Sequence, residues 1–306
     1  MWTRLAAASA IAVALITALA GQPLPNFRTD TRLVVLHATV KNKQGELVTD
    51  LDRRAFTVYE NNRPQPISIF RTDDVPVSMG LVIDNSGSMR RARARVEAAA
   101  LAFVRASNPL DDVFVVNFAD KIRLDVALTR DMSVLEAGIA RVDSIGGTAL
   151  RDAVLMAERY LREHGTHDRQ VLLVITDGND NASTASMKEL RRTVERSDMA
   201  VFAVGLFGDD DSPAASRGRE ELGHLTELTG GAAFFPPSVD DIQTVVLSLA
   251  HQIRKQYTIA YTPLNQSLDG SYRTIRVKVT GPDRPSVRTR PGYWATPEPA
   301  PPPRRS

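Results

Sequence analysis

The chain has 306 residues, of which 43% are hydrophobic and 24% are charged, and it contains no cysteine. This balance is typical of a globular protein and excludes both a disordered chain and a polytopic membrane protein. The chain has 38 Lys and Arg and 36 Asp and Glu, which gives a net charge of +2. This charge is too small to favour nucleic acid or an anionic membrane as the binding partner. The lack of cysteine excludes disulfides, thiolate zinc sites and catalytic thiols.

Residues 1–20 predict a secretory signal peptide. Arg4 is the only charge before Arg28, and the apolar run from Leu5 to Ala20 ends in Ala-Leu-Ala, which suits cleavage before Gly21. A helix of this run would span about 24 Å, less than a hydrocarbon core of about 30 Å, so a retained anchor is the weaker alternative. We therefore expect an exported protein, periplasmic or secreted, that touches the membrane only if this segment stays uncleaved.

The N-terminal segment, residues 21–75, is expected to form β-structure. From residue 30 to residue 71 apolar and polar residues alternate with the period of a strand. Asn61 and Asn62 lie between two such runs and predict a hairpin turn.

Residues 76–256 alternate β-branched apolar runs with helical patterns, which predicts an α/β domain with a doubly wound, mostly parallel sheet. Amphipathic stripes that begin near Val96, Leu150 and Val239 predict helices. The run from Lys121 to Leu128 follows Phe118 after two residues, so it is expected to form an antiparallel edge strand. The buried strands are expected where the sequence is apolar throughout, at Val77–Ile83, Val113–Phe118, Val171–Ile175 and Ala200–Leu206.

The C-terminal segment, residues 257–295, again alternates with the period of a strand, around a turn at Leu268-Asp269-Gly270. Each β segment alone is close to the size below which a core without disulfides or metal rarely holds. We therefore expect the two segments to join into one small β-sandwich into which the α/β domain is inserted. Residues 296–306 are about half proline and predict a disordered tail.

Three loops at the carboxyl ends of the predicted strands carry oxygen donors. Asp84, Ser86 and Ser88 follow the first buried strand at alternate positions, so their side chains can face one point. Thr148 lies in a Gly-Gly-Thr loop before a helix, and Asp177 lies in a Thr-Asp-Gly loop directly after a strand. Open α/β sheets bind ligands at this end. Hydroxyls and carboxylates without His or Cys are the ligands of a hard cation, which indicates Mg²⁺, with Mn²⁺ or Ca²⁺ as alternatives.

This set resembles the metal-ion-dependent adhesion site of the von Willebrand factor type A domain, which integrin I domains share. The resemblance covers residues 76–256, and the flanking β segments are similar to those of exported bacterial proteins that carry such a domain. It implies a Rossmann-like fold in which Ser86 and Ser88 ligate the ion directly. It also implies that Thr148 binds the ion directly or through water, and that Asp84 and Asp177 act largely through waters.

Such a ligand set has a consequence for partners. With hydroxyls next to the ion and carboxylates behind water, the charge of the ion is incompletely neutralised, and the ion attracts an anionic oxygen from outside. In the family this oxygen usually belongs to an Asp or Glu of a partner protein. We therefore expect a protein-binding or adhesion module and no enzymatic activity.

Other interpretations remain open at this point. Asp84, Ser86 and Ser88 could each simply cap the helix that follows. A metal-dependent phosphoester hydrolase is a second alternative, although the sequence shows no general base for it. A third is a structural envelope module with a non-functional metal site. The nucleophile elbow, the dinucleotide fingerprint and the P-loop are all absent from the sequence.

Charged residues near the predicted site have less specific interpretations. Arg90, Arg91, Arg93 and Arg95 open the first helix and are expected to form a solvated face, with a basic rim for acidic partners as the alternative. Asp180 is expected to be a solvated loop residue, with a role in supporting the metal ligands as the alternative.

Overall fold

The computed structural model describes residues 32–141 and 145–296. The predicted signal peptide and nearly all of the proline-rich tail lie outside this range. Within it, no helix combines the length and the apolar character that crossing a membrane requires.

The α/β part is built on a six-stranded sheet of order β10-β9-β8-β5-β6-β7. Five strands are parallel, and β7 pairs antiparallel with β6, so the predicted edge hairpin is confirmed. The strands are β5 (Ser78–Asp84), β6 (Asp112–Phe118), β7 (Ile122–Thr129), β8 (Gln170–Thr176), β9 (Ala200–Gly205) and β10 (Ala233–Phe234).

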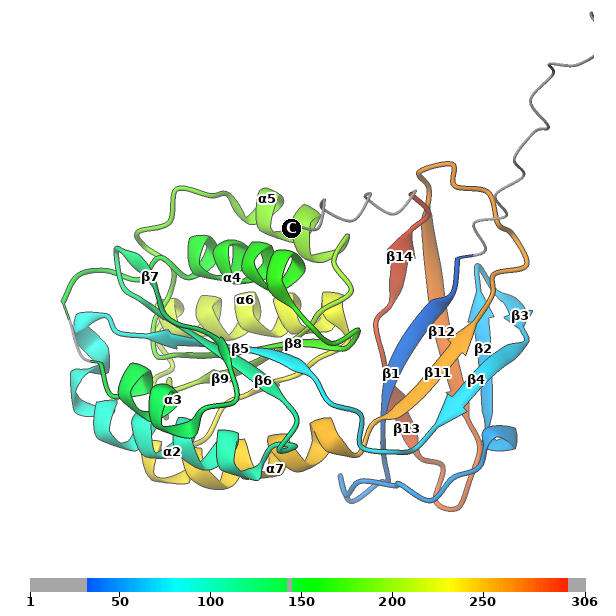
Figure 1. The fold of residues 1–306 in the computed structure, drawn as a ribbon, viewed down its shortest axis with the longest axis horizontal. Helices are drawn as coiled ribbons and strands as arrows, with labels where there is room; N and C mark the ends of the chain where they lie inside the picture. The colour runs from blue at the N-terminus through cyan, green and yellow to red at the C-terminus, as the bar shows by residue number, and fades with distance from the viewer. Residues whose placement is uncertain (1–31, 142–144, 297–306) are drawn as a thin grey trace, which may run out of the picture. The chain divides into compact units, whose positions relative to one another are not determined.

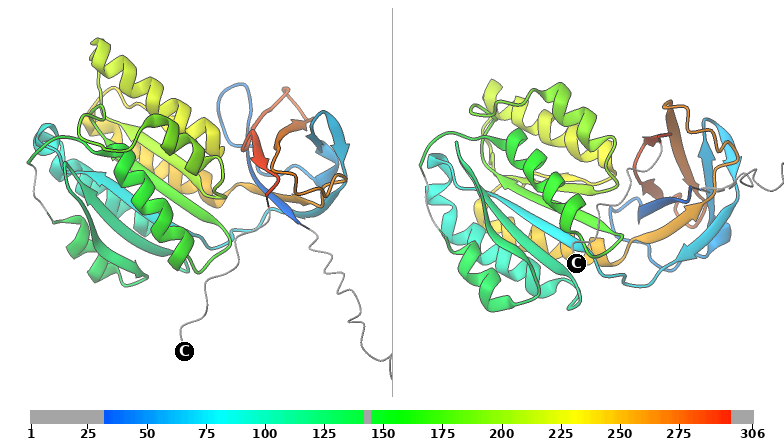
Figure 2. Two further views of the ribbon diagram at one scale, coloured as in Figure 1. Left: turned by 90° about the horizontal axis from the view of Figure 1, so that it is seen from above. Right: turned by 45° about the horizontal axis from the view of Figure 1, so that its top comes forward.

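Helices cover both faces of this sheet (Figure 1). One face packs against α2 (Arg93–Ala106), α3 (Met132–Ile139) and α7 (Ile242–Arg254). The other packs against α4 (Leu150–His164), α5 (Met187–Val194) and α6 (Pro213–Thr229). The two views in Figure 2 show the same layers from other directions. Short 3₁₀ helices, η2 (Gly87–Arg91) and η3 (Val239–Asp241), precede α2 and α7.

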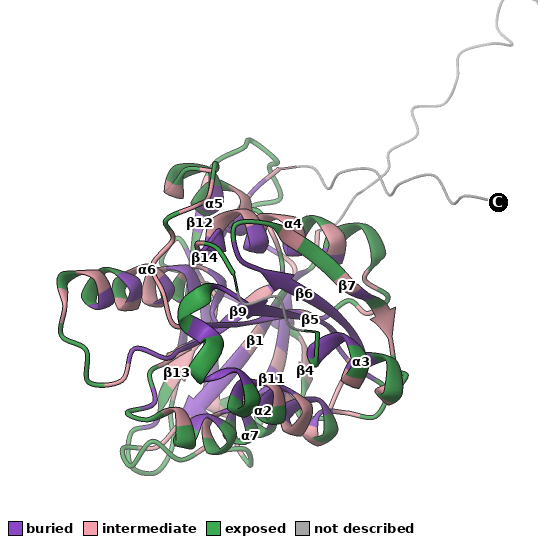
Figure 3. Ribbon diagram, turned by 90° about the vertical axis from the view of Figure 1, so that its left-hand side faces the viewer, coloured by how far each residue is buried: buried purple, intermediate pink, exposed green. Residues whose placement is uncertain are grey.

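The continuous apolar runs in the sequence arise because every strand residue meets one helix layer or the other. In β5, Leu81 packs toward α2 and α7, whereas Val82 packs toward α4. Figure 3 shows these strands as buried while the surrounding helices carry exposed residues. Gly80 marks a tight place in this packing, because a Cβ there would lie 2.4 Å from Phe114 and 2.5 Å from Leu172.

The N- and C-terminal segments combine into a β-sandwich, as expected. One sheet has the order β13-β1-β11-β4 and the other β14-β12-β2-β3, so each sheet contains strands from both segments. Their shared core includes Leu36, Val58, Ile259 and Val277. The strands are β1 (Val34–Lys41), β2 (Phe56–Glu60), β3 (Arg63–Gln65), β4 (Ile67–Arg71), β11 (Tyr257–Tyr261), β12 (Tyr272–Val279), β13 (Ser286–Arg288) and β14 (Gly292–Trp294).

Asn61 and Asn62 form the predicted turn between β2 and β3, both with positive φ. The segment around Gly270 instead passes from one sheet to the other, because β11 and β12 lie in different sheets.

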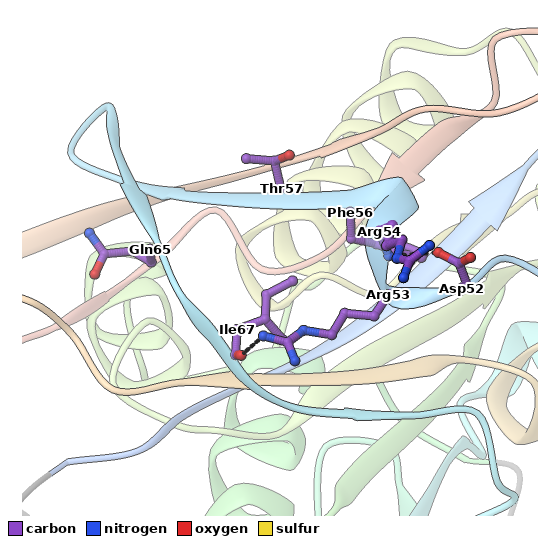
Figure 4. Close-up of a pocket in the computed structure, with 7 residues that line it drawn as sticks. All are labelled: Asp52, Arg53, Arg54, Phe56, Thr57, Gln65 and Ile67. Atoms are coloured by element: carbon purple, nitrogen blue, oxygen red, sulfur yellow. Dashed lines mark hydrogen bonds between the residues drawn. The ribbon is translucent and has the colours of Figure 1, made fainter.

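A cavity of about 500 Å³ lies at the open edge of the sandwich. It is lined by residues of the 3₁₀ helix η1 (Arg53–Ala55), of β2, of the end of β3 and of the start of β4. Figure 4 shows Arg53 extending across it to donate a hydrogen bond to the carbonyl of Ile67. The strand β4 lies at the edge of its sheet, where free backbone groups can pair with another chain. The bond from Arg53 occupies one of these groups, the carbonyl of Ile67.

Buried polar groups connect the α/β part to the sandwich. Arg169, which is 4% exposed, donates to the carbonyl of Ile253 at the end of α7 and to the side chain of Gln256. Gln256 in turn donates to the hydroxyl of Thr39 in β1 over 2.9 Å. These residues flank the place where α7 passes into β11.

Candidate functional site

The five predicted site residues lie on loops that the sheet brings to one end. β5 and β8 are parallel neighbours with Ile83 opposite Ile175, so the residues that follow them leave the sheet side by side. Asp84 ends β5, and Asp177 comes directly after β8. Thr148 lies two residues before α4.

A chain of hydrogen bonds joins the first loop to the third. The hydroxyls of Ser86 and Ser88 lie 3.1 Å apart, and the Ser88 hydroxyl donates to Asp177 Oδ1 over 2.7 Å. Ser86 is 2% exposed, whereas Ser88 is exposed and Asp177 is half-buried. One side of this group therefore faces solvent.

Asp84 lies at the bottom of the site and is fully buried. Its Oδ1 accepts a hydrogen bond of 2.8 Å from the amide of Ser86, and its Oδ2 accepts one from the hydroxyl of Thr176. The pKa of Asp84 is raised to about 6, mainly by burial and to a lesser extent by the charge of Asp177, against the lowering effect of these hydrogen bonds. Burial likewise raises the pKa of Asp177, which the bond from Ser88 opposes.

The main chain of Thr148 is held by the loop after β8. Its amide donates to Asn181 Oδ1 over 2.8 Å, and its carbonyl accepts from the amides of Asn181 and Ala182 at 3.0 and 3.2 Å. The hydroxyl of Thr148 faces Gly178, where a Cβ would lie 3.2 Å from Oγ1. Thr148 is therefore fixed next to the residue that follows Asp177.

The loop before Thr148 is tied to the other strands as well. The carbonyl of Gly146 accepts a hydrogen bond of 3.3 Å from the amide of Gly87, and the amide of Ala149 donates to Ala119 over 2.7 Å. Gly146 has φ +99°, and a Cβ there would lie 2.7 Å from the carboxylate of Asp120. The positive φ is what favours glycine here, and a larger residue would also displace the exposed side chain of Asp120.

Asp180 is not the solvated residue that the sequence suggested. Its side chain is 1% exposed and pairs with Arg151, with an Nη2–Oδ1 distance of 3.0 Å. It also accepts hydrogen bonds from the amide of Arg151 and from the amide and hydroxyl of Ser183. Asp180 thereby links the loop after β8 to the first turn of α4. No local signal reveals this role, because the partner Arg151 lies 29 residues away.

The basic run at the start of α2 also differs from the expectation of a solvated face. Arg93 is 5% exposed and donates to the carbonyls of Ile139 and Arg141 at the end of α3. Arg93 therefore anchors the main chain at the end of α3, while Arg90, Arg91 and Arg95 stay exposed.

Helix capping does not account for the hydroxyls of the first loop. Ser86 occupies the N-cap position of η2, yet its side chain makes no capping hydrogen bond. The helix α2 begins only at Arg93, after Ala92. The hydroxyls of Ser86 and Ser88 instead face each other and Asp177.

The donor set fits a hard cation. The hydroxyls of Ser86 and Ser88 and the carboxylate of Asp177 form one hydrogen-bonded group at the strand ends. A divalent ion bound there would offset the desolvation of Asp84 and its repulsion by Asp177. Among the described residues, no three His, Cys, Asp or Glu side chains are grouped so that they could hold a metal ion. A metal site at these loops would therefore depend on the hydroxyls.

Comparisons with known proteins agree with this fold. Residues 79–179 match the family model of the von Willebrand factor type A domain. No curated protein matches the chain.

Several solved structures align with this chain at low sequence identity. A von Willebrand factor type A protein from Catenulispora acidiphila aligns with TM-score 0.51 and 12% identity, over 89% of this chain and 76% of its own. The D319A mutant of the PilB minor pilin from Streptococcus sanguinis aligns with TM-score 0.51 and 11% identity, over 60% of this chain and 64% of its own. Proximal thread matrix protein 1 from the mussel byssus aligns with TM-score 0.47 and 16% identity over 59% of this chain, which spans only 48% of that protein.

Proposed function

We propose that this chain, whose α/β part is a von Willebrand factor type A domain, is an exported module that binds a partner protein through a divalent cation. The expected ion is Mg²⁺, and the group it binds on the partner is the carboxylate of an Asp or Glu. The residues that would hold the ion are Asp84, Ser86, Ser88, Thr148 and Asp177.

One observation carries this proposal. The hydroxyl of Ser88 donates to Asp177 across two strand-end loops and lies 3.1 Å from the hydroxyl of Ser86, whose amide donates to the buried carboxylate of Asp84. Residues 89 positions apart in the sequence thus present oxygen atoms to one place.

The chain's own residues prepare this place for an ion. The amide of Ser86 and the hydroxyl of Thr176 fix the orientation of the Asp84 carboxylate. Asn181 fixes the main chain of Thr148. A bound ion would supply a positive centre that attracts an anionic oxygen, and the exposure of Ser88 leaves a solvent-facing side from which a partner can approach.

An adhesion or protein-interaction role outside the cytoplasm is consistent with other features. The predicted signal segment indicates export. One structure of the same fold is a minor pilin.

A pull-down experiment tests the proposal. Wild type, Ser88→Ala and Ser267→Ala, each immobilised, are incubated with envelope and secreted proteins of the source organism in Mg²⁺ and in EDTA. Ser267 is exposed, lies in the β-sandwich, and serves as the matched control. We expect a partner that is captured by wild type and by Ser267→Ala in Mg²⁺ only.

Two other results would support the alternatives. A partner retained by every variant in both buffers would favour a structural envelope module. Hydrolysis of p-nitrophenyl phosphate that depends on Mg²⁺ and is lost in Ser88→Ala would favour a phosphoester hydrolase.

A further inference from the structure

A cleft of about 380 Å³ opens directly beside Ser88 and Asp177. Its other walls come from the start of α2, from the end of β9 and from the segment before α7. The lining residues that matter here are Arg91, Arg95, Leu206 and Asp240. The cleft is continuous with the proposed metal site, because Ser88 and Asp177 belong to both.

The two arginines of this cleft differ in their partners. Arg95 forms an ion pair with Asp240 of η3, so these two charges neutralise each other. Arg91 is exposed and makes no side-chain hydrogen bond or ion pair with any part of the chain that the structure describes. Arg91 is therefore the cation of the cleft that remains available to a partner, while the carboxylate of Asp177, which also lines the cleft, belongs to the proposed metal site.

The geometry of η2 places this free charge beside the metal site. Ser88 and Arg91 are three residues apart in the same 3₁₀ helix. Side chains at this spacing eclipse each other in such a helix, with a rise of about 6 Å. An extended peptide presents alternate side chains on one face about 7 Å apart, which matches this spacing.

We propose that the cleft binds a second carboxylate of the partner, held by Arg91, next to the carboxylate that the metal ion holds. The partner segment is then extended and carries two acidic residues separated by one residue. This inference rests on the proposed function, since it names the partner chemistry of the same site.

The chemistry of the cleft suits this ligand. A guanidinium offers two parallel donors to a carboxylate, which gives both strength and orientation. Leu206, 9% exposed, contributes an apolar wall that limits the access of water to such a pair.

Defined peptides test the inference. The diacid peptide is Gly-Ser-Asp-Gly-Asp-Ser-Gly and the monoacid peptide is Gly-Ser-Asp-Gly-Asn-Ser-Gly, both acetylated and amidated. Their dissociation constants are measured by NMR titration of the full chain in Mg²⁺ and in EDTA. The proteins are wild type, Arg91→Gln and, as matched control, Arg90→Gln, which removes the neighbouring charge outside the cleft.

We expect wild type in Mg²⁺ to bind the diacid peptide about five- to tenfold more tightly than the monoacid peptide. In Arg91→Gln this advantage should fall to about twofold, the statistical benefit of having two acids that can each reach the ion. Arg90→Gln should keep the wild-type ratio, and EDTA should abolish binding of both peptides.

Three results would overturn the inference while leaving the proposed function intact. They are Mg²⁺-dependent binding with no diacid advantage beyond the statistical one, an advantage that survives in Arg91→Gln, or an advantage that Arg90→Gln also removes. By contrast, no binding of either peptide in Mg²⁺ at about 10 mM would contradict the carboxylate-binding function itself, and the inference with it.

Discussion

The amide of Thr148 donates a hydrogen bond of 2.8 Å to the side-chain oxygen of Asn181, and the amide of Asn181 returns one of 3.0 Å to the carbonyl of Thr148. This reciprocal pair joins the loop before α4 to the loop after β8. Asn181, which is not a proposed ligand itself, thus fixes the position of the proposed ligand Thr148.

The first prediction concerns this pair. Asn181→Ala should weaken the binding of Mg²⁺ or Mn²⁺ about 10- to 100-fold, because groups that orient metal ligands typically contribute that much. Isothermal titration calorimetry measures the effect. Asn265→Ala is the control, since Asn265 is exposed in the β-sandwich and bonds only within its own turn. An unchanged affinity in Asn181→Ala would show that Thr148 needs no such support.

The second prediction concerns Asp180. Burial raises the pKa of Asp180, but the hydrogen bonds from Arg151 and Ser183 outweigh this effect and hold the pKa below its usual value. Asp180→Asn would leave the charge of Arg151 without its partner and should lower the free energy of unfolding by about 1–3 kcal/mol. Urea denaturation checks this, with the exposed Asp209→Asn as control. Equal stability of the two variants would contradict the role of Asp180 as a link between loops.

The third prediction concerns two glycines, Gly80 in strand β5 and Gly223 in helix α6. Gly80→Ala should destabilise the protein by about 1–3 kcal/mol, because its Cβ would overlap Phe114 and Leu172. Gly223 lies inside α6 with open space around its Cβ position, so Gly223→Ala should stabilise by up to about 1 kcal/mol. Thermal unfolding distinguishes the two, and shifts of the same sign would contradict the packing described here.

The fourth prediction concerns pH. Burial, together with the charges of Arg169 and Arg290, lowers the pKa of His37 to about 3. The unfolded chain binds a proton at His37 near pH 6.5 while the folded chain does not, so stability should fall as the pH drops below about 6.5. At pH 5 the loss from this residue is up to about 2 kcal/mol.

Urea denaturation of wild type and His37→Gln at pH 7.5 and pH 5 isolates this effect, because carboxyl groups titrate alike in both. Wild type should lose more stability than the variant between the two pH values. Identical losses would mean that His37 takes up a proton in the folded state as readily as in the unfolded one.

Much of the fold follows from the sequence. The apolar runs at Leu81 and Leu173 predict buried strands because helices cover both faces of the sheet. The joining of the two β segments follows from their size alone. The helix α6 escaped prediction because Gly218 and Gly223 interrupt its pattern.

The contacts that hold the site together are harder to predict. A run of arginines favours a solvated face, yet Arg93 is buried because the carbonyl of Arg141, 48 residues away, accepts its hydrogen bond. Asp180 is buried for the same kind of reason. Local patterns identify the ligand candidates at strand ends, whereas their supports come from segments that only the tertiary structure brings together.

Calorimetric titration of the purified chain with Mg²⁺ and Mn²⁺ measures the proposed metal site itself, with Ser88→Ala compared against Ser267→Ala. We expect saturable uptake of one ion per chain by wild type and Ser267→Ala, with a markedly weaker affinity in Ser88→Ala. No uptake of either ion by wild type, or equal uptake by all three proteins, would mean that these hydroxyls and carboxylates do not form a metal site.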